Sequence, residues 1–453
     1  MLFCSLKTYE IPELVRKSQI GIELRLDLMP SLNLQKTKEF LERAGVPVLC
    51  TLRKKDDISE ETREEKIEEL LALNPTFFDL EMDLREEFLR RVLHAYQKTK
   101  IILSHHDWQG VPSNLDALYK KMASFDAFAY KIAATPSSVP ETLRFLSQTK
   151  RYPRLSLIAM GMERQWSRVV GGVMGNALAY AGGEEIAPGQ LTLKEMVETY
   201  RYLSLQKKTR IYALIGNPIT KSRGHLYHNA FFGKQGIDAL YVKIALPPEE
   251  LEEFLVLAPE LGFFGCSVTM PLKEKVLPFI DALDAEAATI GAVNTLKWEG
   301  RCLFGTNTDG KGALDALEEK LMVAGKRIVL LGAGGAARAI AFEAKRRGAD
   351  VLLLNRTQER ARGVAEELGV QWASLSAIKE EYDAVVNCTP DPMPVEASDL
   401  QEGKVTMDIS ITPTPFLEAA FKKASPLVYG EEMFVRQAAR QSHFWFGESL
   451  CNP

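Results

Sequence analysis

The chain of 453 residues has little of what marks secreted, membrane and nucleic-acid-binding proteins. Its six cysteines stand far apart, at positions 4, 50, 266, 302, 388 and 451, and neither they nor the histidines cluster at metal-ligand spacing, so no disulfide framework and no metal site is expected. No apolar run is long enough to span a membrane, and residues 1–6 lack the pattern of a signal or transit peptide. A net charge of −4 offers no basic surface for nucleic acid. Composition therefore predicts a globular, cytoplasmic protein with reduced thiols and with neither a membrane nor a nucleic-acid partner.

A glycine turn between two apolar runs is the most informative motif. Residues 328–338 read Ile-Val-Leu-Leu-Gly-Ala-Gly-Gly-Ala-Ala-Arg, and the next apolar run ends in Asn-Arg-Thr at 355–357. The glycines allow a tight turn and let backbone N–H groups approach a pyrophosphate at a helix N-terminus. An NAD site needs an acid at the tip of the second strand, but Arg356 stands there and Asp350 precedes the strand. A guanidinium favours a 2′-phosphate, so the motif predicts NADP(H). The alternative is a glycine turn that binds nothing.

Eight short apolar runs alternate with helical patterns in the first part of the chain, which predicts a (β/α)₈ barrel. The runs are Leu2–Leu6, Ile20–Leu26, Val46–Leu52, Phe77–Met82, Lys100–Ser104, Ala127–Ile132, Leu155–Met160 and Leu178–Ala181. Polar residues fall at the ends of five successive runs: Glu23, Arg25 and Asp27, then Arg53, then Asp79, Glu81 and Asp83, then His105, His106 and Asp107, then Lys131. The strand ends of a parallel barrel meet at one mouth, where active sites lie. A single such residue could be a surface charge, but five strands in succession favour a site.

Lys131 lies in the apolar stretch Ala-Phe-Ala-Tyr-Lys-Ile-Ala-Ala. Desolvation and neighbouring cations lower the pKa of a lysine, which makes it a nucleophile toward carbonyls. A histidine on the neighbouring strand can move protons near neutral pH, and His106, next to Asp107, is the better candidate because His105 would face the other side of the strand. These residues indicate an imine-forming lyase or aldolase acting on an anion held by arginines. A structural lysine at a strand end is the alternative.

Several polar turns precede the glycine motif in the second part of the chain. They are Gly216–His225, the stretch Ser267–Lys273 after a strand, Gly291–Thr295 and Gly305–Gly310. Each could be an ordinary cap or turn. A lysine, an aspartate and two asparagines upstream of a nucleotide fold nevertheless suggest a site that binds a polyol and moves a proton during hydride transfer.

Over about the first 205 residues the motifs resemble type I 3-dehydroquinate dehydratase. They are Glu23-Leu-Arg-Leu-Asp27, Thr51-Leu-Arg53, Asp79-Leu-Glu81, Ser104-His-His-Asp107, Lys131-Ile-Ala, Ser167-Arg168 and Ala187-Pro-Gly-Gln190. The resemblance implies that Lys131 forms a Schiff base with a ketone and that His106, helped by Glu81, moves the protons. It implies that substrate hydroxyls and carboxylate are held by Glu23, Arg25, Arg53, Arg168 and Gln190. Ile186 stands where many relatives have serine, so one hydroxyl contact is expected to be missing.

Residues 210–450 resemble shikimate dehydrogenase. This implies a catalytic pair in which Lys273 donates a proton to the developing alkoxide and Asp309 orients it. It implies substrate contacts from Ser222, Asn294, Asp309 and Gln437, and NADP contacts from Gly332, Gly334, Gly335, Asn355, Arg356 and Thr357. Three positions depart from the bacterial pattern: Gly224 for serine, Ser267 for asparagine, and Ile411 for tyrosine.

Together the two parts resemble the fused 3-dehydroquinate dehydratase/shikimate dehydrogenase of plants. The resemblance implies dehydration of 3-dehydroquinate to 3-dehydroshikimate, followed by NADPH-dependent reduction to shikimate. It implies a barrel over residues 1–207, a substrate-binding domain over 208–308, a Rossmann domain over 309–429, and a C-terminal helix over 430–453 that returns to the substrate-binding domain. Two alternatives are a dehydrogenase half that acts on quinate and a metabolite sensor without turnover. The sensor is disfavoured because Lys131, His106, Lys273 and Asp309 are all present.

Overall fold

The computed structural model describes residues 1–54, 58–183 and 189–447. These residues form two compact units. The first contains residues 1–210 with the short segments 238–240 and 256–262, and the second contains 211–237, 241–255 and the chain from 263 onward. Within the described ranges, no helix combines the length and the apolarity that crossing a membrane requires. Five cysteines lie in these ranges, and all five are free thiols: Cys4, Cys50, Cys266, Cys302 and Cys388.

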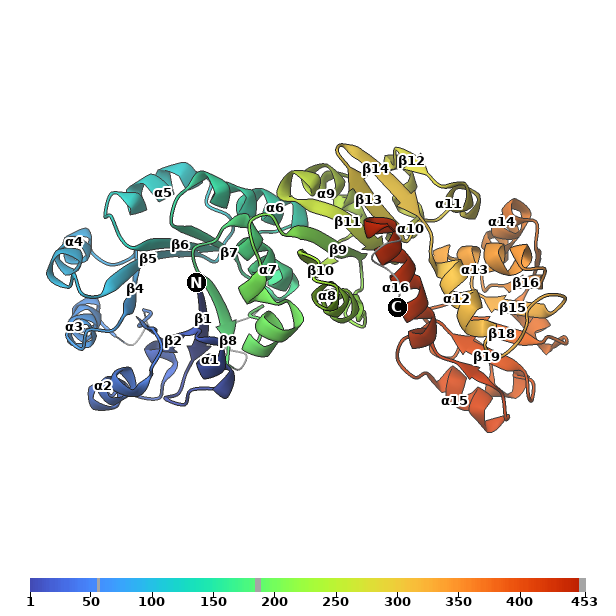
Figure 1. Cartoon of the computed structure of the whole chain (residues 1–453), viewed down its shortest axis with the longest axis horizontal. Coiled ribbons are helices and arrows are strands. Elements are labelled where there is room, and N and C mark those ends of the chain that lie inside the picture. The colour runs from blue at the N-terminus through green and yellow to red at the C-terminus, as the bar shows by residue number, and fades with distance from the viewer. Residues whose placement is uncertain (55–57, 184–188, 448–453) are drawn as a thin grey trace. The chain divides into compact units, whose positions relative to one another are not determined.

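The first unit is built on an eight-stranded parallel sheet that curls into a barrel (Figure 1). Its strands are β1 (Leu2–Leu6), β2 (Gly21–Arg25), β3 (Val48–Thr51), β4 (Phe77–Glu81), β5 (Lys100–Asp107), β6 (Ala129–Ala134), β7 (Leu155–Ala159) and β8 (Ala179–Gly182). Strand β8 pairs with β1, and just before β8 the Ala177 N–H donates to the Leu155 carbonyl at 3.2 Å, which brings this segment against β7. The predicted (β/α)₈ barrel is confirmed.

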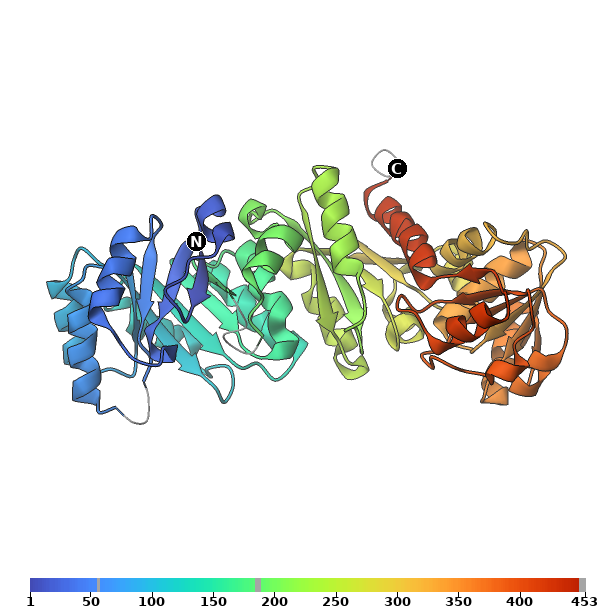
Figure 2. The same cartoon turned by 90° about the horizontal axis from the view of Figure 1, so that it is seen from below.

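Helices surround this barrel on its outer side (Figures 1 and 2). They are α1 (Glu13–Ser18), α2 (Leu34–Arg43), α3 (Glu60–Leu71), α4 (Glu86–Ala95), α5 (Leu115–Ala123), α6 (Val139–Ser147) and α7 (Gln165–Met174). Four of them begin at a polar side chain that accepts a hydrogen bond from the first turn: Asn33, Ser59, Asn114 and Ser138. Alternate strand residues such as Phe3, Leu49 and Phe77 fill the barrel interior, so the site lies above a packed floor.

Two strands depart from the sequence pattern: β5 is longer than predicted, and β6 begins and ends two residues later than the predicted run at 127–132. Strand β5 continues through His106 to Asp107 because its backbone stays paired with β6 as far as Ala134. The histidines are therefore part of a strand, and Lys131 is the third residue of β6 instead of its last. Residues 195–204 do not form one continuous helix: Arg201 has φ 51°, which separates a π-helical turn (Glu195–Thr199) from a 3₁₀ turn (Tyr202–Ser204).

The second unit begins with a mixed sheet in the order β10-β9-β11-β13-β14-β12. These strands are β9 (Arg210–Gly216), β10 (Ala239–Ala245), β11 (Phe263–Val268), β12 (Ala282–Leu283), β13 (Thr295–Glu299) and β14 (Cys302–Thr306). Its helices are α8 (Gly224–Lys234), α9 (Leu251–Leu257), α10 (Leu272–Lys275) and α11 (Ala285–Ile290).

A second sheet follows, entirely parallel, in the order β17-β16-β15-β18-β19-β20. Its strands are β15 (Arg327–Leu331), β16 (Asp350–Leu354), β17 (Gln371–Ala373), β18 (Ala384–Asn387), β19 (Val405–Asp408) and β20 (Leu427–Val428). Its helices are α12 (Asp309–Leu317), α13 (Gly335–Arg346), α14 (Gln358–Leu368) and α15 (Pro415–Lys422). The chain enters this sheet at its central strand β15, builds one half outward to β17, and then crosses over to build the other half from β18 to β20. This is the doubly wound order of a dinucleotide-binding fold, which confirms the predicted Rossmann sheet.

The last helix, α16 (Gly430–Phe446), returns from the parallel sheet to the mixed one (Figure 1). It packs along α12, and the Trp445 indole donates to the Leu296 carbonyl of β13 at 2.9 Å. Since α12 also starts at the end of β14, residues from both sheets meet around these two helices.

Candidate functional site

A buried ion-pair network occupies the barrel centre. Lys131 Nζ donates to Asp79 Oδ2 at 2.5 Å, and Arg53 holds the same carboxylate with two hydrogen bonds of 3.0 and 2.9 Å. Burial and then the charge of Arg53 lower the pKa of Lys131. Burial alone would raise the pKa of Asp79, but Arg53 and Lys131 outweigh it and hold that pKa well below its usual range. The site thus contains a lysine that loses its proton more easily than usual.

His106 lies beside this network, with Nδ1 at 3.0 Å from Glu81 Oε1. Burial lowers the pKa of His106 to about 4 even though Glu81 opposes the shift. Glu81 is itself fixed by Arg53 at 3.0 Å and by Arg63 at 2.7 Å. His106 is therefore a neutral, oriented base at neutral pH, held by Glu81 and not by the adjacent Asp107. His105, expected to face away, also borders the cavity.

The cavity above Lys131 has a volume of about 660 Å³ and is bordered by all the residues expected to bind substrate in this half: Glu23, Arg25, Arg53, Arg168 and Gln190. Glu23 accepts from Thr51 at 3.0 Å, and Arg25 forms a two-point ion pair with Asp27. Ile186 lies outside the described residues.

Arg168 lines this cavity and has no carboxylate partner among the described residues. Its Nε and the Gln190 Oε1 are buried with no hydrogen bond from the described chain. Burial lowers the pKa of the Arg168 guanidinium to about 10, yet it stays charged at neutral pH. A partly buried cation without a partner is costly, so this arrangement suits an anionic ligand that carries hydroxyl groups.

A second cluster lies where α10, α12 and α16 meet. Lys273 Nζ donates to Asp309 Oδ2, and the Asn294 amide donates to Asp309 Oδ1 at 2.8 Å, to Thr308 Oγ1 at 2.9 Å and to Gln437 Oε1 at 3.3 Å. Asp309 and Asn294 are 5% and 2% exposed. The fold thus brings together four predicted residues, with the Asp309 carboxylate at the centre: Lys273, Asn294, Asp309 and Gln437.

Ser222 lies apart from that carboxylate, near a chain of hydrogen bonds that leads to it. Its hydroxyl accepts from the Gly224 N–H at 3.3 Å. The Tyr241 hydroxyl donates to Ser267 Oγ at 2.7 Å, and Ser267 contacts Gln441 Oε1 at 2.9 Å. Gln441 in turn donates to the Asn294 carbonyl at 3.0 Å. A side chain at position 224 would come within 3.2 Å of the Tyr241 hydroxyl, so glycine there leaves room for the Tyr241–Ser267 pair.

The glycine turn adjoins this second cluster. Gly332 has φ +114°, a conformation that favours glycine, and Gly334 precedes α13 with open space around it. A methyl group on Gly335 would lie 3.0 Å from Lys273 Cβ. The N-terminus of α13, suited to a pyrophosphate, is therefore next to the lysine of the cluster.

The end of β16 carries three residues expected to contact NADP, among them Arg356, whose guanidinium is expected to bind the 2′-phosphate. The Asn355 amide donates to the Thr357 carbonyl at 2.8 Å, which forms a tight turn. Arg356 is exposed in this turn and forms no ion pair within the described part of the chain. Asp350 is the first residue of β16, at the other end of the strand, where it accepts from Gln371 at 3.0 Å. The residues thus fit a cofactor with a 2′-phosphate.

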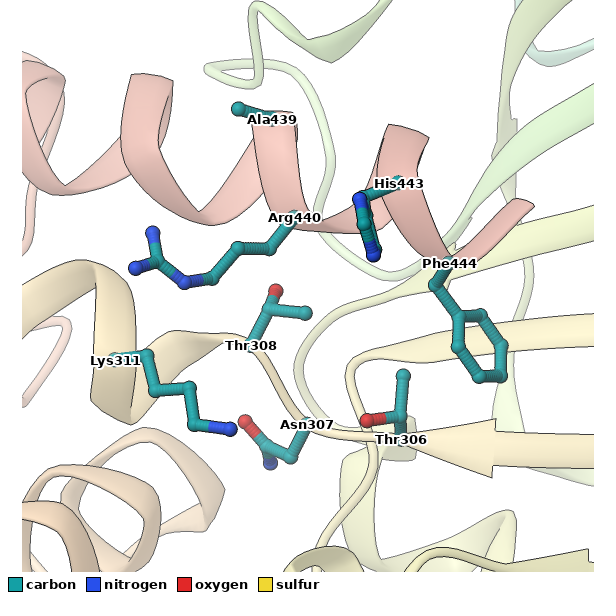
Figure 3. Close-up of a pocket in the computed structure, with 8 residues that line it drawn as sticks. All are labelled: Thr306, Asn307, Thr308, Lys311, Ala439, Arg440, His443 and Phe444. Carbon is teal, nitrogen blue, oxygen red and sulfur yellow. The ribbon is translucent and has the colours of Figure 1, made fainter. Parts of the chain in front are cut away.

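The turn at residues 306–308 also borders a hollow of about 460 Å³ (Figure 3). Lys311, Arg440, His443 and Phe444 complete its wall. Lys311 is paired with Glu286 at 2.7 Å and Arg440 with Asp315, so these two cations are already neutralised. Gln437 lies on the same helix as Arg440 and accepts from Asn294 of the Asp309 cluster at 3.3 Å.

A barrel with a buried lysine, joined to a two-sheet dinucleotide-binding enzyme, is the class of protein that this fold and these sites define. Three families match successive parts of the chain: Type I 3-dehydroquinase over residues 8–207, Shikimate dehydrogenase substrate binding domain over 214–296, and Shikimate / quinate 5-dehydrogenase over 315–412.

Relatives match almost the whole chain. A Shikimate biosynthesis protein AroDE of Chlamydia pneumoniae is 34% identical over 95% of this chain and 90% of its own length. The chloroplastic bifunctional 3-dehydroquinate dehydratase/shikimate dehydrogenase of Arabidopsis thaliana is 30% identical over 94% of this chain and 77% of its own. A solved shikimate dehydrogenase in complex with NADP⁺ is 35% identical over 54% of this chain and 92% of its own, with TM-score 0.52.

The chain belongs to the family of bifunctional 3-dehydroquinate dehydratase/shikimate dehydrogenase proteins. It is a lyase and an NADP-dependent oxidoreductase of the shikimate pathway, as the sequence predicted. The quinate and sensor alternatives are not favoured.

Proposed function

We propose that Lys131 is the nucleophile of the dehydration. Its amine attacks the ketone carbon of 3-dehydroquinate, the carbonyl oxygen is protonated, and water leaves to give an iminium ion. A neutral His106 then removes a proton from the adjacent carbon, and the C–H electron pair moves toward the iminium nitrogen to give an enamine. The enamine electrons return and expel the hydroxyl of the next carbon, which takes the proton held by His106 and leaves as water. Hydrolysis releases 3-dehydroshikimate. The observation that carries this proposal is the buried Lys131 beside the neutral, oriented His106.

Substrate binding in the barrel rests on charge complementarity. Arg168 pairs with the substrate carboxylate, because this partly buried guanidinium lacks a carboxylate partner among the described residues. Gln190, Glu23 and Arg25 border the same cavity and hold hydroxyls. Arg53 keeps Asp79 and Glu81 ionised and so acts mainly through them.

In the second unit, Lys273 donates a proton to the alkoxide that develops as 3-dehydroshikimate is reduced to shikimate. Asp309 orients the ammonium and binds a substrate hydroxyl together with Asn294 and Gln437. Ser222 binds the far end of the substrate, beside Tyr241. NADPH, when bound, supplies the hydride. Gly332, Gly334 and Gly335 would hold its pyrophosphate, and Asn355, Arg356 and Thr357 its 2′-phosphate.

We assign dehydration to residues 1–207 and NADP binding to residues 309–429. Binding of the second substrate is assigned to residues 208–308 together with the helix over 430–453. The two single variants Lys131→Ala and Lys273→Ala test the assignment. Lys131→Ala should consume NADPH with 3-dehydroshikimate but not with 3-dehydroquinate, whereas Lys273→Ala should form 3-dehydroshikimate from 3-dehydroquinate without consuming NADPH. Full dehydration by Lys131→Ala would disprove the imine mechanism, and unchanged reduction by Lys273→Ala would remove the proposed proton donor.

A further inference from the structure

Tyr180 on β8 presents an aromatic face to the lysine of the barrel. Lys131 Nζ lies over the Tyr180 ring, 4.7 Å from its centroid. The ring is 6% exposed, borders the cavity and stacks on Phe3, with centroids 5.8 Å apart and an angle of 23° between the planes. Its hydroxyl is buried without a hydrogen-bond partner in the described chain, so packing and not a hydrogen bond holds the ring in place.

The nitrogen of Lys131 is positively charged in two species, the ammonium and the iminium. These two species differ in the number of N–H groups that they can donate. As an ammonium it has three N–H donors, and one of them reaches Asp79. As an iminium it keeps a single N–H, so support by hydrogen bonding is reduced. An aromatic face attracts a cation through the quadrupole of the ring and needs no N–H donor. This attraction is stronger at a desolvated site, and Lys131 is 4% exposed.

We infer that Tyr180 is a catalytic residue of the dehydratase site, whose ring face stabilises the positive charge of the iminium formed at Lys131 Nζ. The inference rests on the role proposed above for Lys131. In the step concerned, the nitrogen lone pair forms the C–N bond, the former carbonyl oxygen leaves as water after taking up two protons, and the charge remains on nitrogen. No oxidant or reductant takes part.

Two substitutions separate the ring from the hydroxyl. Tyr180→Phe keeps the aromatic face, and Tyr180→Met removes it while nearly conserving apolar volume. Phe77→Met is the matched control, because it removes a ring of the same barrel floor that packs on Phe3, and it leaves the Phe3–Tyr180 stack and Lys131 in place. Each protein is incubated with 3-dehydroshikimate, whose ketone forms the same imine, and treated with borohydride across a pH series. Peptide mass mapping then gives the fraction of Lys131 reduced to a secondary amine.

We expect wild type, Tyr180→Phe and Phe77→Met to trap similar fractions, and Tyr180→Met to trap about tenfold less. The upper pH midpoint of trapping should fall in Tyr180→Met, because its iminium loses the proton more readily. This midpoint does not depend on how much of the variant is folded. Equal trapping and an equal midpoint in Tyr180→Met would overturn the inference, as would an equal loss in Tyr180→Phe, which would assign the effect to the hydroxyl. Failure of wild type to form any adduct at Lys131 would instead disprove the imine proposal itself.

Discussion

Replacing Asp79 by asparagine tests the buried network in the barrel most severely. Asp79 is 2% exposed and binds both Lys131 and Arg53. Removing one partner of a buried ion pair costs about 3–5 kcal/mol, because the remaining charge is left without compensation. Arg53 retains Glu81 in the variant, so the lower figure, about 3 kcal/mol, applies. For a unit of this size that corresponds to a fall in unfolding temperature of about 6–12 °C.

The effect of the Asp79→Asn substitution should depend on pH in a definite direction. The folded pKa of Asp79 is held below its unfolded value, so the carboxylate stabilises the barrel fully above about pH 4 and loses this effect as the pH falls further. The stability difference between wild type and variant should therefore be largest near neutral pH and shrink in acid.

Scanning calorimetry of the full chain measures this loss. NADP⁺ stabilises the unit that binds it, so the transition that does not shift with NADP⁺ belongs to the barrel. Asp126→Asn is the matched control, because Asp126 is 88% exposed in its pair with Arg154 and a surface pair contributes about 0–1 kcal/mol. A barrel transition in Asp79→Asn within 2 °C of that control would refute the account of the network.

Three further predictions follow from the two sites. The kcat/KM of dehydration should rise with pH through about 4 as His106 becomes neutral, whereas a rise centred near pH 6.5 would show that burial does not shift the pKa of this histidine. The variant His106→Gln should lower kcat by about 10²–10⁴-fold. Arg168→Met should raise KM for 3-dehydroquinate by about tenfold or more in initial-rate measurements, since it removes the cation for the substrate carboxylate, and an unchanged KM would place the carboxylate elsewhere. Arg356→Ala should raise KM for NADPH by about tenfold but leave KM for NADH unchanged, with the exposed Arg362→Ala as control; equal effects on both cofactors would argue against a 2′-phosphate contact.

Local patterns were sufficient to predict the elements that carry the sites. Alternating apolar runs located all eight barrel strands, and the glycine turn located β15 and α13, because both depend on residues close in sequence. Asp79 was within reach of the same reasoning: it lies two residues before Glu81 on β4, and residues at that spacing share one face of a strand. The contact between Asp79 and Lys131, and the position of the Tyr180 ring over the same nitrogen, depend on how the strands close into a barrel. Local sequence patterns therefore cannot predict them.

Contacts made by the last helix could not be derived from local patterns. Gln441 follows Gln437 by one helical turn, which places both on one face, but nothing nearby in sequence indicates that this face meets Asn294. That meeting requires α16 to return past the parallel sheet. The break between the two helical turns at residues 195–204 is also not visible in the sequence, since the left-handed backbone at Arg201 occurs without glycine at that point.

The most direct test of the central claim, that one chain performs both reactions in succession, is to give the purified protein 3-dehydroquinate and NADPH alone and follow the loss of NADPH absorbance. The account predicts steady NADPH consumption and the appearance of shikimate, with a lag while 3-dehydroshikimate accumulates. Consumption only when 3-dehydroshikimate is supplied would contradict the assignment of the barrel, and no consumption with either compound would contradict the account as a whole.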